Sequence, residues 1–142
     1  MKKLVINPIM LFLFNNLIYS QAVWNQYKGP YMGDVLCMES KGDTLYAGTE
    51  LSGLFFSTDM GYSWNSTGVL GFINTIYRSD TLILAAINDT PIISRDNGIN
   101  WEYYPSISSI FQFFNFKGEV YAATALGVFK FDAASNNWIE KS

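Results

Sequence analysis

Two segments of the chain hold residue types that often carry chemistry, a hydroxyl followed by a carboxylate. Residues 57–64 and residues 94–101 both follow the pattern S-x-D-x-G-x-x-W. A carboxylate in such a segment suggests a calcium loop or a carboxylate-based catalytic site. A calcium loop needs several oxygen ligands, however, and each segment supplies a single carboxylate. We therefore interpret both segments as structural turns.

Every residue type of the pattern has a structural reason. The Asp accepts hydrogen bonds from N–H groups of its own turn, the Gly adopts a positive φ, and the Trp packs its ring over the hairpin. A third copy, residues 131–138, keeps the Trp but has lost the Ser, Asp and Gly, and Asp132 lies one position early. The predicted structural residues are Ser57, Asp59, Gly61, Trp64, Ser94, Asp96, Gly98, Trp101 and Trp138.

The composition excludes several classes of chemistry. The 142 residues include no His, which excludes Ser-His-Asp triads and histidine metal sites. Cys37 is the single cysteine, so the chain has neither an internal disulfide nor a cysteine zinc cluster. The net charge of −3 and the lack of a basic cluster are unsuited to binding nucleic acid. We expect no cofactor, no metal and no nucleic-acid partner.

The elements that must position these residues repeat along the chain. Trp64, Trp101 and Trp138 are 37 residues apart. Each unit contains four short apolar runs separated by turn residues, which predicts four strands, and nothing after residue 20 shows sustained helical periodicity. Such units are typical of β-propeller blades, so we predict an all-β fold of four-stranded antiparallel blades, an incomplete propeller or arc. The predicted units span about residues 30–67, 68–104 and 105–142.

The two intact segments resemble the Asp-box, also called the BNR repeat. This box recurs in the propellers of sialidases, xyloglucan-cleaving glycosidases, sortilin-type receptors and photosystem II assembly factors. The resemblance covers residues 22–142 and implies that the boxes lie on the outer rim, away from a central binding face. It implies an architecture rather than a single activity, because one scaffold serves many functions.

The resemblance does not extend to a catalytic set. Sialidases resemble one another in holding the substrate carboxylate with three arginines, whereas this chain has only Arg78 and Arg95. A glycosidase needs two carboxylates that flank the scissile bond. We expect turn roles for Asp43 and Asp80, and no other feature singles out a pair, so we predict a non-catalytic chain. The further candidate carboxylates outside the boxes include Asp34, Glu39, Glu50, Asp89, Glu102 and Glu119.

Three apolar features are predicted to pack rather than to bind. Cys37 lies in an apolar strand, where a buried and inert thiol is expected. Residues 111–116 contain four phenylalanines, which predicts rings on both faces of a strand between two blades. Tyr103 and Tyr104 are expected to pack, with an exposed pair that stacks on carbohydrate as the alternative.

The first 20 residues follow the pattern of a secretory signal peptide. Lys2 and Lys3 precede a short apolar stretch, and Ser20 suits the position before the cut. A buried strand or helix is the alternative. The stretch is too short and too polar for a membrane anchor, so we expect no stable membrane insertion and a secreted, periplasmic or cell-surface protein. Trp24 predicts the outer strand of a preceding blade, with a disordered arm as the alternative.

A closed propeller needs about four to eight blades, and this chain encodes about three. It is therefore a fragment, which we favour, or an open arc, or one of two copies that complete a six-bladed ring. We expect a binding or scaffold module for a protein or glycan ligand. The alternatives are a fragment of an Asp-box glycoside hydrolase, sialidase- or xyloglucanase-like, and a sensor propeller. The ligand site is expected at the channel mouth, along Val35–Met38, Ile73–Tyr77 and Ile110–Phe116.

Two kinds of side chain would distinguish these functions at the channel. A glycosidase would place paired carboxylates there, about 5–10 Å apart. A binding module would place aromatic or amide side chains there instead.

Overall fold

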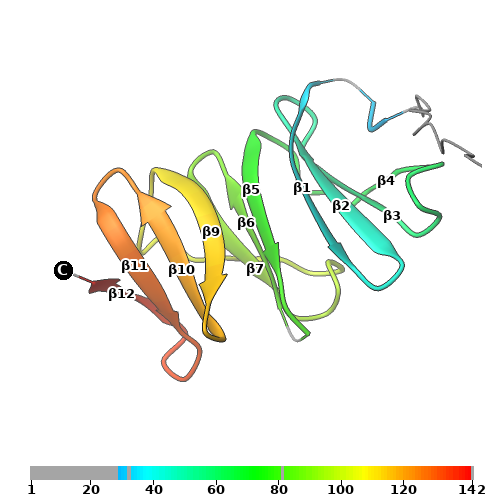
Figure 1. The fold of residues 1–142 in the computed structure, drawn as a ribbon. Helices are drawn as coiled ribbons and strands as arrows, with labels where there is room; N and C mark the ends of the chain where they lie inside the picture. Colours follow the sequence, from blue (N-terminus) through cyan, green and yellow to red (C-terminus); the bar gives the residue numbers. More distant parts are fainter. Residues whose placement is uncertain (1–28, 32, 81, 142) are drawn as a thin grey trace, which may run out of the picture.

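The computed structural model describes residues 29–31, 33–80 and 82–141. Over these residues twelve strands form three four-stranded antiparallel sheets that stand side by side (Figure 1). The fold is therefore all-β and an incomplete propeller, as the repeats predict, and each sheet is one blade. The predicted signal peptide, residues 1–20, and the predicted strand at Trp24 lie outside the described residues.

The first blade contains β1 (Val35–Lys41), β2 (Thr44–Thr49), β3 (Leu54–Ser57) and β4 (Asn65–Ser66), which lie in this order. The last four residues of β2 are buried, whereas both residues of β4 are exposed. The blade is thus most buried in its middle strands. The predicted run Val35–Met38 begins where β1 begins and ends three residues before it, and Trp64 lies directly before β4.

The second blade contains β5 (Ile73–Arg78), β6 (Ile83–Ile87), β7 (Thr90–Ser94) and β8 (Glu102–Tyr103). All five residues of β6 are buried, because a neighbouring blade covers each face of this sheet. An uninterrupted apolar run, I-L-A-A-I, is the sequence that such a strand requires.

The third blade contains β9 (Ile110–Phe116), β10 (Glu119–Thr124), β11 (Gly127–Asp132) and β12 (Asn137–Lys141). The bounds of β9 match the predicted run Ile110–Phe116. Among the described residues there is no helix long and apolar enough to cross a membrane.

Two apolar cores join the three blades. Successive side chains of β6 point to opposite faces of its sheet, so this strand contributes residues to both cores. Ile83 and Ala85 pack toward the first blade, in a core with Tyr46 and Leu54. The alternate residue Leu84 packs toward the third blade. The second blade is therefore covered on both faces, while the first and third blades each have one face covered by residues that the structure describes.

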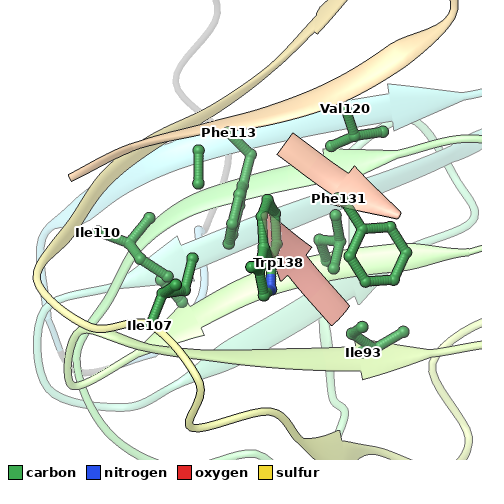
Figure 2. Packing of buried hydrophobic residues seen from close by; sticks show 10 residues of the cluster. Ile93, Ile107, Ile110, Phe113, Val120, Phe131 and Trp138 are labelled. Atoms are coloured by element: carbon green, nitrogen blue, oxygen red, sulfur yellow. The ribbon is translucent and has the colours of Figure 1, made fainter. Parts of the chain in front are cut away.

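Trp138 lies at the centre of the core between the second and third blades (Figure 2). Its ring stacks on Phe113 with the centroids 5.6 Å apart, and it meets Phe131 at 5.1 Å. Ile93 of the second blade lies in the same cluster. The third tryptophan of the repeat thus packs against the preceding blade.

The first two blades approach closely at Gly48 in β2. A Cβ atom there would lie 2.5 Å from Ile73 and 2.6 Å from the Sγ of Cys37. Any side chain would force the blades apart, so the position needs glycine for space rather than for a positive φ.

The prediction for the phenylalanine run is wrong on one face of β9. Phe113 is buried against the second blade, but the side chains of Phe111, Phe114 and Phe116 are 64%, 38% and 56% exposed. The reason is that no further blade covers the outer face of the third sheet among the described residues.

Candidate functional site

The inner strands of the three blades, β1, β5 and β9, each carry a β-bulge near the start of the strand. The pairing of β1 with β2 shifts between Val35 and Cys37, and that of β5 with β6 shifts between Ile73 and Thr75. In β9 the shift falls between Ile110 and Gln112, opposite β10. Such bulges re-aim side chains and often occur next to functional sites. The bulged residues are Leu36, Asn74 and Phe111.

A groove of about 370 Å³ runs across these bulges. All three inner strands contribute to it, which agrees with the predicted location of the ligand site. Glu39 is the single carboxylate among its lining residues, beside the amides of Asn74 and Gln112 and the exposed ring of Phe111. The groove is lined by Leu36, Cys37, Met38, Glu39, Asn74, Thr75, Ile76, Phe111, Gln112 and Phe113.

Side chains of one inner strand bond to the backbone of the next across the groove floor. The Sγ of Cys37 donates to the Ile73 carbonyl at 3.5 Å, and the Nδ2 of Asn74 donates to the Ile110 carbonyl at 2.6 Å. The N–H of Phe113 donates to the Oγ1 of Thr75 at 3.0 Å. These bonds satisfy backbone groups that have no partner strand and hold the groove in shape.

The Cys37 thiol is suited to packing rather than to nucleophilic chemistry. It is half-buried, and burial raises its pKa to about 11. A thiol with such a pKa is protonated near neutral pH, and the thiolate is the nucleophilic form.

The first S-x-D-x-G-x-x-W segment forms the turn between β3 and β4. The Ser57 hydroxyl donates to Asp59 Oδ1 at 2.7 Å and accepts from the Gly61 N–H at 2.8 Å. The other end of the turn is held by Ser63, whose N–H and hydroxyl donate to the Asp59 carboxylate at 2.9 and 2.6 Å. These hydrogen bonds lower the pKa of Asp59 to about 2.

The second segment repeats this network between β7 and β8. The Ser94 hydroxyl donates to Asp96 Oδ1 at 2.9 Å and accepts from the Gly98 N–H at 2.8 Å. The N–H and the side-chain amide of Asn100 donate to the Asp96 carboxylate at 2.8 and 2.7 Å, which lowers its pKa to about 2. The Trp101 Nε1–H donates to the Gly98 carbonyl at 3.1 Å. The carboxylates thus serve their own turns.

The third hairpin, between β11 and β12, keeps part of the network. Asp132 accepts from the Ser135 hydroxyl and, at 3.3 Å each, from the N–H groups of Ala134 and Ser135; the hydroxyl bond first, and then the N–H bonds, lower the pKa of Asp132. The Nε1–H of Trp138 is buried with no hydrogen-bond partner among the described residues.

The other candidate carboxylates are dispersed rather than paired. Glu102 lies 3.5 Å from Arg95 and Glu119 lies 2.7 Å from Lys130, both as ion pairs. Asp80 pairs with Lys41. Asp34, Asp43, Glu50 and Asp89 do not line the groove. Within the described part of the chain, no group of three or more Asp, Glu, Cys or His side chains could hold a metal ion.

The two tyrosines of the predicted packing pair differ in their surroundings. Tyr104 packs against the core between the second and third blades and donates to Glu102 at 2.9 Å. Tyr103 is 63% exposed. The prediction of packing therefore holds for Tyr104 alone.

Sequence reasoning missed the bulges, and it included Asn74 only as part of the range Ile73–Tyr77 without singling it out. The strands themselves were expected, but a bulge depends on how two strands pair, and the inner strands have no common residue type at that position. The sequence carries no signal for it, because the 37-residue spacing aligns Asn74 and Phe111 with Cys37 rather than with the bulged Leu36.

No protein-family model matches the chain, and no curated protein is similar to it in sequence. Solved structures do share its fold. YCF48 bound to D1 peptide is 17% identical with a TM-score of 0.59, over 84% of this chain and 43% of that one. An ancestral GH74 enzyme is 19% identical with a TM-score of 0.66, over 80% and 19% of the two chains. The Niastella koreensis GH74 enzyme is 21% identical with a TM-score of 0.58, over 68% and 19%.

This chain therefore spans less than half the length of each of these proteins. At such identities the likeness concerns the propeller fold.

Proposed function

We propose that this chain is an exported, non-catalytic binding module of Asp-box type, and that the groove across β1, β5 and β9 takes a segment of a protein ligand. The observation that carries the proposal is the alignment of three bulges in one groove. They bring an apolar, an amide and an aromatic side chain together, namely Leu36, Asn74 and Phe111. An extended peptide offers the apolar and amide groups that match this lining.

The groove chemistry favours binding over glycoside hydrolysis. A hydrolase of the usual kind needs two carboxylates at the scissile bond, and Glu39 is the single carboxylate in the lining. That YCF48 was solved with a D1 peptide is compatible with a peptide ligand for a propeller of this shape. A glycan is the alternative ligand, because exposed aromatic rings also stack on sugars.

The test is a selection of peptides from a displayed random library on the purified full chain, with a glycan array in parallel. Phe111→Ala is the informative variant, because this ring is 64% exposed and its loss leaves the core intact. Tyr103→Ala is the matched control, since Tyr103 is 63% exposed and lies on β8, outside the groove.

We expect selected peptides to lose about tenfold or more in affinity to Phe111→Ala and to bind Tyr103→Ala unchanged. Ligands that bind Phe111→Ala as tightly as the wild type would refute the groove as the site. Enrichment on the glycan array alone would replace the protein ligand by a glycan. Release of sugar from xyloglucan, abolished by Glu39→Gln, would refute the non-catalytic assignment.

A further inference from the structure

The junction between the first and second blades has polar contacts on its rim. The Tyr46 hydroxyl donates to the Asn97 carbonyl at 3.1 Å, and the guanidinium of Arg78 lies 5.1 Å from the Tyr46 ring centroid. Lys41, at the end of β1, pairs with Asp80 in the β5–β6 turn. Two polar contacts thus join these blades. One is the hydrogen bond from Tyr46 to the β7–β8 hairpin, and the other is the ion pair between Lys41 and Asp80.

The outer face of the third blade presents the donor half of the same junction. Tyr121 is the equivalent of Tyr46 in the third blade. Tyr46 pairs with the residue before Ser57, and Tyr121 pairs with the residue before Phe131, which aligns with Ser57 in the repeat. Its ring stacks on Phe114 at 5.4 Å, on the face that no described blade covers. Lys117 lies in the β9–β10 turn, one residue beyond the position equivalent to Lys41, and is exposed.

The outer face of the first blade presents the acceptor half. Met60 in the β3–β4 hairpin has a φ of 61°, and Asn97 at the equivalent place has a φ of 60°. Both carbonyls are therefore presented by the same turn conformation. Asp43 lies exposed in the β1–β2 turn, as Asp80 lies in the β5–β6 turn.

The first blade also has an apolar hollow at this face. Trp64 lies beside Gly61 as Trp101 lies beside Gly98, with the ring 3.6 Å from a Cβ placed on the glycine in both cases. Trp101 packs into the core that Leu54 shares with the second blade. Trp64 instead borders a hollow of about 270 Å³, which is lined by Gly29, Pro30, Val35, Met38, Leu45, Ala47, Met60, Gly61 and Trp64.

We propose that two copies of this chain associate head to tail, the third blade of each on the first blade of the other, and close a six-bladed ring. Tyr121 of one copy donates to the Met60 carbonyl of the other, and Lys117 pairs with Asp43. Trp64 packs on Tyr121 and Val128, which has the place of Leu54. Six blades lie within the usual range, and the second copy supplies the other half of a channel that three inner strands line on one side.

One position of the third blade is more polar than its equivalent. Lys130 stands where the first blade has Phe56. Its charge is paired with Glu119 at 2.7 Å, and Phe56 is itself only half-buried in the junction that is formed. The ion pair therefore lies at a part of the interface where complete burial is not required.

The first measurement is the native mass of the full chain by size-exclusion chromatography with light scattering. We expect two chains per particle. A particle of one chain at the highest soluble concentration would overturn the proposal, because the hollow would then be covered by residues of its own chain or by another protein. Larger open assemblies would overturn the closed ring.

Charge exchange at the interface tests the pairing itself. Asp43→Lys and Lys117→Asp each place like charges at both junctions, so each variant alone should raise the dimer dissociation constant about tenfold or more. An equimolar mixture of the two variants restores Lys117 with Asp43 in one junction and the exchanged pair in the other. Native mass spectrometry of isotopically labelled variants should therefore show a mixed dimer.

Glu140→Lys is the matched control, since it makes the same charge change at an exposed position of β12. It should leave the dimer unchanged. If Asp43→Lys dimerises as the wild type does, or if the mixture fails to form the mixed dimer, the head-to-tail contact is refuted. The peptide selection does not depend on this result, so the two proposals fail separately.

Discussion

Equivalent tryptophans, Trp101 and Trp138, lie in the last hairpins of the second and third blades, and different interactions stabilise the two hairpins. In the second blade a closed hydrogen-bond network shapes the turn, and the Trp101 Nε1–H donates to Gly98 at 3.1 Å. In the third blade the network is partial, and Trp138 is buried to 6% exposure, with no acceptor for its Nε1–H in the part of the chain that the structure describes. The comparison teaches that the S-x-D-x-G-x-x-W pattern stabilises a hairpin locally, and that apolar packing replaces it where the pattern is lost.

Truncation of the two tryptophans to alanine should give the largest difference in stability between the two hairpins. Trp138→Ala should lower the free energy of unfolding by about 3–5 kcal/mol, because a buried ring leaves a large cavity. Trp101→Ala should cost less, because Trp101 is only half-buried. Urea denaturation of the two variants measures the difference. A larger loss at Trp101 would show that the network, rather than packing, dominates the stability of both hairpins.

Removal of the serine of the S-x-D-x-G-x-x-W pattern should destabilise the second-blade hairpin more than removal of a serine destabilises the third-blade hairpin. Ser94 is 1% exposed, donates to Asp96 and accepts the Gly98 N–H, so Ser94→Ala removes two partly buried hydrogen bonds and should cost about 1–3 kcal/mol. Ser135→Ala is the control in the third hairpin. Ser135 is exposed, and its loss should cost no more than about 0.5 kcal/mol. Equal losses in urea denaturation would contradict the local role of the network.

The sequence predicts the local features of this fold, and it does not predict the features that depend on strand pairing or on a neighbouring blade. The 37-residue spacing of the tryptophans predicts the blades, because each blade is one local unit of four strands. The bulges at Leu36, Asn74 and Phe111 depend on strand pairing, and their residue types have nothing in common. The exposed rings of β9 depend on whether another blade is present, which is not a property of the strand.

The indole N–H groups provide a finer test of the two hairpins. Phe retains most of the ring but has no N–H, so Trp138→Phe removes a donor for which the described residues supply no acceptor. Trp101→Phe removes the bond to Gly98, which is worth about 0.5–1.5 kcal/mol. Measured against the alanine variants, phenylalanine should recover a larger share of the stability at position 138. An equal share at both positions would show that the Trp101 bond contributes nothing.

The smallest expected effect is the pH dependence of the carboxylates in the turns between the last two strands of each blade. Hydrogen bonds hold the pKa of Asp96 at about 2 in the folded chain, below its ordinary value near 4. A lowered pKa contributes stability above the ordinary value, and this contribution is lost as the pH falls from about 4 to about 2. The thermal midpoint should therefore fall over this interval, and Asp96→Asn should flatten the fall.

Asp132→Asn is the matched variant in the third hairpin. Its carboxylate accepts from the Ser135 hydroxyl and, at 3.3 Å, from the N–H groups of Ala134 and Ser135, and these N–H bonds are longer than the 2.8 Å bond from the Asn100 N–H to Asp96. Asp132→Asn should therefore flatten the fall less than Asp96→Asn does. If the two variants change the slope equally, the partial network of the third hairpin is as effective as the complete one. Packing around Trp138 would then add to a local network of full strength rather than replace it.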